Sequence, residues 1–179
     1  MMHPPEQIAT TRLLLRKPLM EDADAIFREY AGDPEATKYL TWKTDEESSQ
    51  AADYIRKALR DWQEGRIFSW AICLQGSGGV VGMIDARVDG YMVNIGYVLG
   101  RAHWNKGYAT EALSAVLHWT DAEEDVQRVW AVCAVENLAS ARVMEKAGMK
   151  REGTLRHWMV FPNLSGVPMD CYCYAHVKG

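Results

Sequence analysis

Hydrophobic residues recur along this chain with two different periods, and the changes of period divide the chain into elements. Three leucines within residues 12–16 predict a strand. The apolar residues that follow have the spacing of one helix face; they are Ala23, Ile26, Phe27 and Tyr30. Helical spacing then returns up to Gly65, preceded by Thr44 and Glu47 at the spacing of a capping box. The chain is therefore expected to begin with a strand and two helices.

Short apolar runs replace the helical spacing from Ile67 onward. The runs are residues 67–74, 80–88 and 91–99. Residues 75–79, which are rich in glycine, and the pair Asp89-Gly90 separate these runs, so an antiparallel meander is predicted. Asp-Gly predicts a tight type I′ turn, in which both central residues have positive φ. We interpret the glycine cluster as a hairpin loop rather than a phosphate loop, because a strand follows it and the sequence Gly-x-x-x-x-Gly-Lys-Ser/Thr is absent.

The loop at residues 100–107 precedes the clearest helical pattern of the sequence. The apolar positions of this pattern form a nearly continuous stripe of Ala109, Ala112, Leu113, Val116, Leu117 and Thr120. Residues 128–135 predict a buried strand. Asn137 predicts the N-cap of a further helix that ends at Gly148, because Asn is a preferred N-cap and Gly commonly follows a C-cap.

Two strands are predicted to complete the chain, at residues 153–161 and 170–177, around a turn at residues 162–166. No internal repeat, linker or low-complexity segment interrupts the pattern. We therefore expect one mixed α/β domain of the α+β type over residues 1–179.

Composition and charge argue against several classes of function. With 48% hydrophobic and 25% charged residues, the chain is an ordinary globular protein, and its net charge of −4 gives no reason to expect nucleic-acid binding. No apolar run approaches the roughly 20 residues that cross a bilayer. The start of the chain, residues 1–5, lacks the charge and apolar stretch of a signal peptide. We expect a cytoplasmic protein without a membrane partner.

Cysteine and histidine spacings predict no metal site. None of the cysteines forms a Cys-x-x-Cys pair, and all lie in apolar, strand-like runs; they are Cys73, Cys133, Cys171 and Cys173. The five histidines include no pair with metal-site spacing. Buried free thiols are expected, with no bound metal.

A possible anion site lies where the predicted strand ending at Leu99 leads through a loop into the helix starting near Tyr108. The first N–H groups of a helix have no partner within it, so this end attracts anions. Gly107 allows close backbone approach, and Ala109 keeps the first turn free of a large side chain. Arg101 and Lys106 either add charge there or are solvated loop residues. On physical grounds alone, Gly107 could equally serve only for a tight entry into the helix.

Three segments carry a resemblance to a known family. They are Arg-Ala-His-Trp-Asn-Lys-Gly-Tyr-Ala-Thr-Glu-Ala at residues 101–112, Asn-Leu-Ala-Ser at 137–140 and Glu-Lys-Ala-Gly-Met at 145–149. Together they resemble the GNAT superfamily of N-acetyltransferases, and most of all its ribosomal-protein N-terminal acetyltransferase branch. The resemblance implies a mostly antiparallel, twisted sheet flanked by helices. It also implies an enzyme that moves the acetyl group of acetyl-CoA directly to an amine.

The same resemblance implies where acetyl-CoA binds. In the signature Gln/Arg-x-x-Gly-x-Gly/Ala, Gly107 and Ala109 fill the last two defined places, whereas Trp104 departs from the first. The strand around Tyr97 should lend its backbone to the pantetheine arm. The expected cofactor-binding residues are Val98, Leu99, Trp104, Asn105, Lys106, Gly107, Tyr108, Ala109 and Asn137.

Ser140 is the candidate catalytic acid implied by this resemblance. The superfamily often carries a tyrosine on this helix, but the matching residue here is Met144, which cannot donate a proton. Ser140 stands three residues after Asn137, so the alternative is that it only completes the helix cap.

The acceptor side of the reaction is less defined by the sequence. Four residues are unranked candidates for a general base: Asp85, Glu136, Glu152 and His157. Four aromatic residues could line an acceptor pocket or belong to the core: Tyr39, Trp42, Trp70 and Trp158. The expected acceptor is a protein or peptide N-terminal α-amine or a small-molecule amine, and the enzyme is expected to be a monomer or homodimer. The alternatives are a CoA-binding module without turnover and a dinucleotide enzyme, and the latter is disfavoured because Gly-x-Gly-x-x-Gly is absent.

Overall fold

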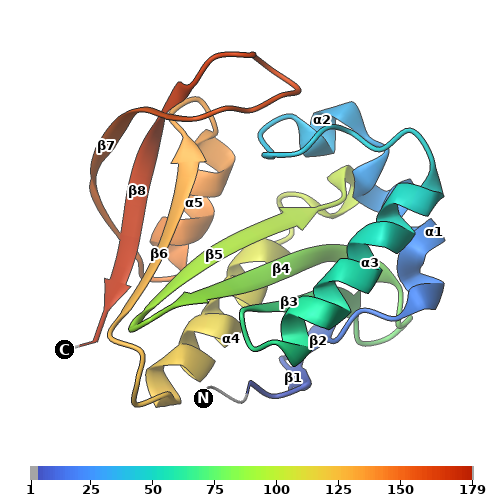
Figure 1. The fold of residues 1–179 in the computed structure, drawn as a ribbon. Coiled ribbons are helices and arrows are strands. Elements are labelled where there is room, and N and C mark those ends of the chain that lie inside the picture. Colours follow the sequence, from blue (N-terminus) through green and yellow to red (C-terminus); the bar gives the residue numbers. More distant parts are fainter. Residues whose placement is uncertain (1–3, 179) are drawn as a thin grey trace.

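The computed structural model describes residues 4–178, which form a layered α/β structure around one eight-stranded sheet (Figure 1). Residues 1–3, where the chain start was assessed for a signal peptide, lie outside the described range. The strands are β1 (Gln7–Ala9), β2 (Leu13–Arg16), β3 (Ile67–Leu74), β4 (Val80–Asp89), β5 (Met92–Leu99), β6 (Arg128–Ala134), β7 (Lys150–Met159) and β8 (Met169–Val177). Their order in the sheet is β1-β2-β3-β4-β5-β6-β8-β7, and only the β5–β6 pair is parallel. The expected mostly antiparallel sheet is confirmed.

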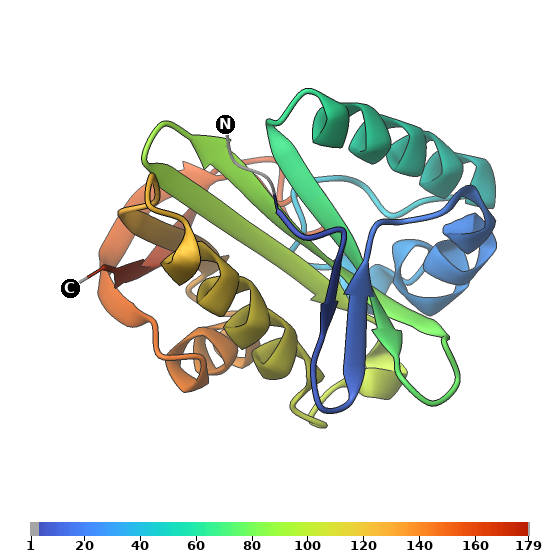
Figure 2. The same ribbon diagram turned by 90° about the horizontal axis from the view of Figure 1, so that it is seen from below.

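Helices cover both faces of the sheet, as Figure 2 shows in the view from below. They are η1 (Met20–Asp22), α1 (Ala23–Ile26), η2 (Phe27–Ala31), α2 (Pro34–Thr37), α3 (Ser48–Gln63), η3 (Arg101–His103), α4 (Tyr108–Ala122) and α5 (Leu138–Lys146). α1 and α3 pack on one face through residues such as Ile26 and Ile55, and α4 and α5 pack on the other through Leu113 and Met144. Successive side chains of a strand point to opposite faces of the sheet. Both faces are apolar because apolar residues occupy both sets of positions.

The core contains a group of edge-to-face aromatic rings, formed by Trp62, Phe68, Trp70 and Trp119. Trp70 is fully buried, and its indole N–H donates to the Pro5 carbonyl over 3.0 Å. Of the two alternatives for Trp70, the structure therefore shows the core, because its ring is fully buried there and its polar atom already has a partner.

The second predicted helix begins later than the sequence suggested. The N-cap of α3 is Glu47, whose partner in the capping box is Gln50. Thr44 lies before this helix, where its hydroxyl contacts Thr37 over 2.6 Å. The spacing of Thr44 and Glu47 was misleading because a tertiary contact, rather than the helix end, uses the Thr44 hydroxyl.

Three further differences concern short elements. β1 and α2 were not predicted, since each has at most four residues and carries little periodicity. The first predicted helix is divided into η1, α1 and the π-helical η2. The β4–β5 hairpin is present, but among its turn residues only Gly90 has positive φ, at +57°, so the turn is not type I′.

The structure also describes the cysteines, possible metal ligands and possible membrane-spanning helices of residues 4–178. All four cysteines are free; Cys73, Cys133 and Cys171 are buried, whereas Cys173 is half-buried. Within residues 4–178, no group of three or more His, Cys, Asp or Glu side chains is arranged to hold a metal ion. No helix in this described part of the chain has the length and apolarity needed to cross a bilayer.

Candidate functional site

The loop before α4 exposes a row of unpaired backbone N–H groups. Gly107 is the N-cap of α4 and has φ of +81°, a left-handed conformation that suits glycine. The N–H groups of residues 105–110 donate to no acceptor within residues 4–178, and the first backbone hydrogen bond of the helix runs from Glu111 to the Gly107 carbonyl over 3.0 Å. Such a row, at the positive end of a 15-residue helix, favours an anionic ligand with several oxygens.

Side chains from two directions hold this loop in place. The indole N–H of Trp104 donates to the Leu99 carbonyl over 2.9 Å, which closes the loop onto the end of β5. On the other side, Arg101 forms an ion pair with Asp33, and His103 lies 3.3 Å from the carboxylate of Glu29. A loop fixed in this way does not need to be reorganised when a ligand binds.

The two cations expected near the loop differ in their surroundings. The Asp33 carboxylate offsets the charge of Arg101, so Arg101 is not a free cation as the sequence allowed. Lys106 is exposed, and its ammonium has no ion-pair partner in the part of the chain that the structure describes. Sequence reasoning missed a third cation, Arg12, whose guanidinium donates to the Lys106 carbonyl over 2.9 Å.

The strand before the loop has a backbone edge without a partner strand. β5 and β6 pair only from Met92 to Asn94 on β5 and from Arg128 to Trp130 on β6, and the two strands then diverge (Figure 1). Val98 and Leu99 lie on the unpaired part, although the Leu99 carbonyl already accepts one hydrogen bond from Trp104. β5 stays paired with β4 along its length, but on the side facing β6 its backbone has no partner strand beyond Asn94, which leaves an edge for an extended ligand.

Asn137 and Ser140 lie at the start of α5. The Asn137 side chain accepts a hydrogen bond from the Ser140 backbone N–H over 3.1 Å, so Asn137 is the predicted N-cap. Gly148 follows this helix with φ of +92°, as predicted for the residue beyond a C-cap. The Asn137 N–H donates to the Ala134 carbonyl over 2.8 Å. To complete the cap, the Ser140 hydroxyl would have to accept a hydrogen bond from the Asn137 N–H. It does not, because that N–H already donates to the Ala134 carbonyl.

The Ser140 hydroxyl instead contacts Tyr97 of β5. Their oxygens are 2.8 Å apart, and the Tyr97 hydroxyl also donates to the Ser140 carbonyl over 3.1 Å. Burial raises the pKa of Tyr97, and the hydrogen bond with Ser140 opposes this only in part, so the phenol stays protonated. Sequence reasoning considered only the backbone of Tyr97. Met144 is fully buried in the core and offers no proton.

Cys133 on β6 lies in the same region but is not a reactive thiol. Burial raises its pKa to about 12, and the Ser140 hydroxyl acts in the opposite direction. A thiol that stays protonated at neutral pH is a poor nucleophile.

The four base candidates lie in different places. Asp85 pairs in register with Gly96 of β5, and its carboxylate accepts hydrogen bonds from Tyr54 over 3.0 Å and Arg87 over 2.8 Å. Glu152 forms an ion pair with Arg128 on the outer strands. His157 lies in an irregular part of β7 with φ of +47°, and Glu136 lies in the turn before α5.

The remaining aromatic candidates gather near the β7–β8 loop. The Tyr39 ring contacts Phe161 edge to face, while Trp42 and Trp158 are more than a third exposed. Asn163 of the β7–β8 loop donates to the Trp42 carbonyl over 2.9 Å and joins this loop to the segment before α3.

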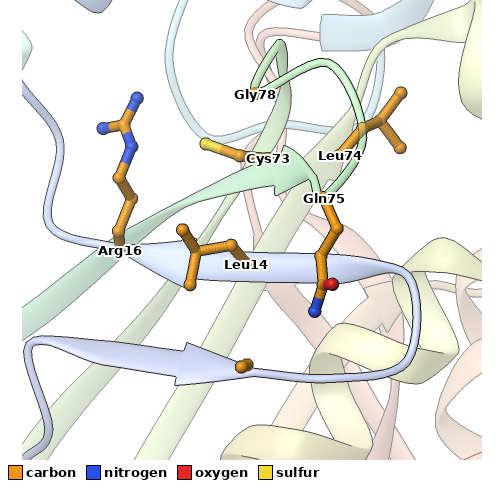
Figure 3. A pocket seen from close by; sticks show the side chains of 7 residues that line it. Leu14, Arg16, Cys73, Leu74, Gln75 and Gly78 are labelled. Carbon is orange, nitrogen blue, oxygen red and sulfur yellow. The ribbon is translucent and has the colours of Figure 1, made fainter.

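A cavity of about 340 Å³ lies elsewhere, beside the ends of β2 and β3 (Figure 3). Its lining residues are Ala9, Leu14, Arg16, Cys73, Leu74, Gln75 and Gly78. None of the expected site residues lines it, and its one cation, Arg16, forms an ion pair with Asp22 over 2.7 Å.

Known proteins resemble the chain in sequence and structure. A family model described as an acetyltransferase (GNAT) domain matches residues 12–150. The N-acetyltransferase p20 of Bacillus licheniformis is 32% identical over 178 residues, covering 97% of each chain.

Two solved structures share the fold over nearly all of their length. A GNAT-family acetyltransferase from Bacillus anthracis superposes with a TM-score of 0.83 at 30% identity, covering 96% of this chain and 98% of the other. The ribosomal L7/L12 α-N-protein acetyltransferase RimL, in complex with coenzyme A, gives 0.85 at 20% identity, with coverage of 96% and 98%.

Proposed function

The chain belongs to the GNAT family of acetyltransferases and is an acetyl-CoA-dependent N-acetyltransferase, and from this premise we propose how its residues divide the reaction. The pyrophosphate of acetyl-CoA binds to the backbone N–H groups of residues 105–110. The single observation that supports this assignment is that these groups have no acceptor within residues 4–178. Gly107 and Ala109 leave room for close approach, while the uncharged Trp104 side chain shapes the loop through its hydrogen bond to the Leu99 carbonyl.

The unpaired edge of β5, including Val98 and Leu99, binds the pantetheine arm. This proposal is supported by the early end of the β5–β6 ladder. Free N–H groups on that edge are also suited to the thioester carbonyl, where negative charge develops as the amine attacks. Asn137, which opens α5, contacts the coenzyme from the other side of the diverging strands.

Ser140 donates a proton to the leaving thiolate in this proposal. The amine nitrogen forms a bond to the carbonyl carbon, the carbon–sulfur bond breaks, and the sulfur gains the proton of Ser140. The proton that the nitrogen loses returns to Ser140 through bound water, so that Ser140 ends the reaction as a neutral hydroxyl. A coenzyme A thiol has a pKa of about 8.5, like a free cysteine, so a weak donor suffices. Support comes from the Ser140 hydroxyl, which the helix cap does not use and which lies 2.8 Å from Tyr97.

The acceptor is proposed to be a protein or peptide N-terminal α-amine or a small-molecule amine, and the reaction favours α-amines. An α-amine has a pKa of about 8, compared with about 10.4 for lysine, so a neutral nucleophile is available without a strong base. We assign no residue as base, and a bound water is sufficient to accept the proton that the attacking nitrogen loses. RimL is named as a protein α-amine acetyltransferase, which makes peptide N-termini the first acceptors to test.

A screen of acceptors tests this proposal. Acetyl-CoA is incubated with the protein and with either ribosomal-protein N-terminal peptides or small amines, and acetylated products are identified by mass spectrometry while thiol release is followed. The expected result is acetylation of α-amines together with stoichiometric thiol. Binding of coenzyme A without thiol release for any amine would instead favour the module without turnover.

A further inference from the structure

Arg12 connects the N-terminal strands to the loop before α4, although it lies 94 residues from that loop in sequence. Its guanidinium donates to the Lys106 carbonyl over 2.9 Å and lies 4.7 Å from the centre of the Tyr108 ring. A Cβ atom on Gly107 would be 3.3 Å from the Arg12 Nη2 atom. The guanidinium therefore lies beside Gly107, the N-cap of α4, within the row of free N–H groups at residues 105–110.

The contact with Lys106 fixes the orientation of one N–H group. In a planar trans peptide, the carbonyl of one residue and the N–H of the next point in opposite directions. Because Arg12 binds the Lys106 carbonyl, the Gly107 N–H is directed away from the guanidinium, and it donates to no acceptor within residues 4–178.

Arg12 also neutralises a carboxylate in the first turn of α4. The Arg12 Nε–H donates to one oxygen of Glu111 over 2.7 Å, and the Arg12 backbone N–H donates to the other over 2.8 Å. The Thr10 hydroxyl contributes a further hydrogen bond of 2.6 Å. Burial raises the pKa of Glu111, but the bonds from Thr10 and Arg12 outweigh burial and hold the pKa below its ordinary value. Glu111 is therefore ionised at neutral pH.

An ionised carboxylate at this position opposes a second anion at the same helix end. It would compete with phosphate for the positive end of the helix dipole and repel it directly. The guanidinium offsets this repulsion because its Nε and Nη2 atoms both lie 2.7 Å from the same carboxylate oxygen, Oε2, in a charge-assisted contact. The Arg12 side chain still keeps 46% of its surface exposed, so part of the guanidinium remains open to solvent.

We propose that Arg12 is a positioning residue for the pyrophosphate of the acyl donor: it orients the Gly107 N–H group and cancels the charge of Glu111. This inference rests on the proposed binding of acetyl-CoA at residues 105–110. It assigns to the N-terminal strands a role in donor affinity rather than in the chemical step.

The test compares Arg12→Gln, Glu111→Gln and the double variant by calorimetric titration with coenzyme A and by steady-state kinetics. Arg12→Gln should weaken coenzyme A binding by about tenfold or more, as expected when a charge-assisted hydrogen bond is lost, and raise the KM for acetyl-CoA with little change in kcat. The double variant should regain part of that affinity, because no uncompensated carboxylate remains. A purely structural Arg12 would give no such recovery.

Arg56→Gln is the matched control, since Arg56 also pairs with a carboxylate, Asp53, but lies on α3. It should leave affinity unchanged, and thermal unfolding should confirm that each variant is folded. Unchanged affinity in Arg12→Gln, or a double variant that binds no better than Arg12→Gln, overturns the inference. Absence of coenzyme A binding by the wild-type protein would instead overturn the proposed function itself.

Discussion

The phenol oxygen of Tyr97 lies 2.8 Å from the hydroxyl oxygen of Ser140, and these two residues join β5 to α5 beside the point where β5 and β6 diverge. A phenol has one proton, which Tyr97 can donate either to the Ser140 hydroxyl or to the Ser140 carbonyl. When it donates to the hydroxyl, the proton of Ser140 is free for a leaving thiolate. The pair is therefore a candidate proton relay.

Replacing Ser140 with Ala should lower kcat by about 10- to 100-fold, because a proton donor to the leaving group is lost. The KM for acetyl-CoA should change by less than about threefold, since the coenzyme contacts remain. The cap of α5 uses the Ser140 backbone N–H, so thermal stability should be nearly unchanged. Equal losses of stability and kcat would contradict the assignment.

Replacing Tyr97 with Phe should lower kcat by less than Ser140→Ala does, because the serine hydroxyl remains but loses its donor. The ring keeps its packing against the core, so the fold should persist. In steady-state kinetics, Tyr97→Phe should add almost nothing to the loss in Ser140→Ala, as expected for two residues that act as a unit. Additive losses would show that Tyr97 acts independently of Ser140.

Replacing Gly107 with Val should weaken coenzyme A binding strongly, because its Cβ would lie 3.3 Å from the Arg12 Nη2 atom and would displace the guanidinium that holds the loop. Gly65→Val is a matched control, since Gly65 has φ of +69° and no atom within 4 Å of its missing Cβ. Both variants should lose stability by at least about 1–2 kcal/mol from backbone strain. Calorimetry should then show lost affinity only for Gly107→Val, and an equal effect of both changes would argue against a site at this loop.

The contribution of Glu111 to stability should depend on pH. Its pKa is lower in the folded protein than the ordinary value of 4.5, so its stabilising bonds are present above about pH 4.5 and are lost as pH falls through the folded value. Denaturant unfolding of wild type and Glu111→Gln should differ at pH 7, with wild type more stable, and the difference should shrink in acid. A difference that stays constant down to pH 3 would contradict the pKa shift.

Local patterns in the sequence predicted the elements of the site well. The apolar stripe of α4, the cap at Asn137 and the end of α5 at Gly148 each depend on residues within one or two turns, so periodicity and turn chemistry reveal them. The resemblance to acetyltransferases then gave the family correctly.

Contacts between distant segments could not be predicted in this way. Arg12 and Glu111 are 99 residues apart, and Tyr97 and Ser140 are 43 residues apart, so only the folded sheet brings each pair together. The same limitation explains why Thr44 was interpreted as part of a capping box and why the sequence left Trp70 open between an acceptor pocket and the core. Thr44 binds Asn163 as well as Thr37, and Trp70 binds Pro5. Asn163 and Pro5 lie far from these residues in sequence.

The position of the pyrophosphate site can be tested by the change in backbone amide NMR shifts when coenzyme A is added to the 15N-labelled protein. The proposed site requires that the largest shifts belong to the amides of residues 105–110, because these N–H groups acquire phosphate acceptors. It would be contradicted if these amides stayed unchanged while shifts gathered elsewhere, for example around Arg16 and Cys73 at the cavity in Figure 3.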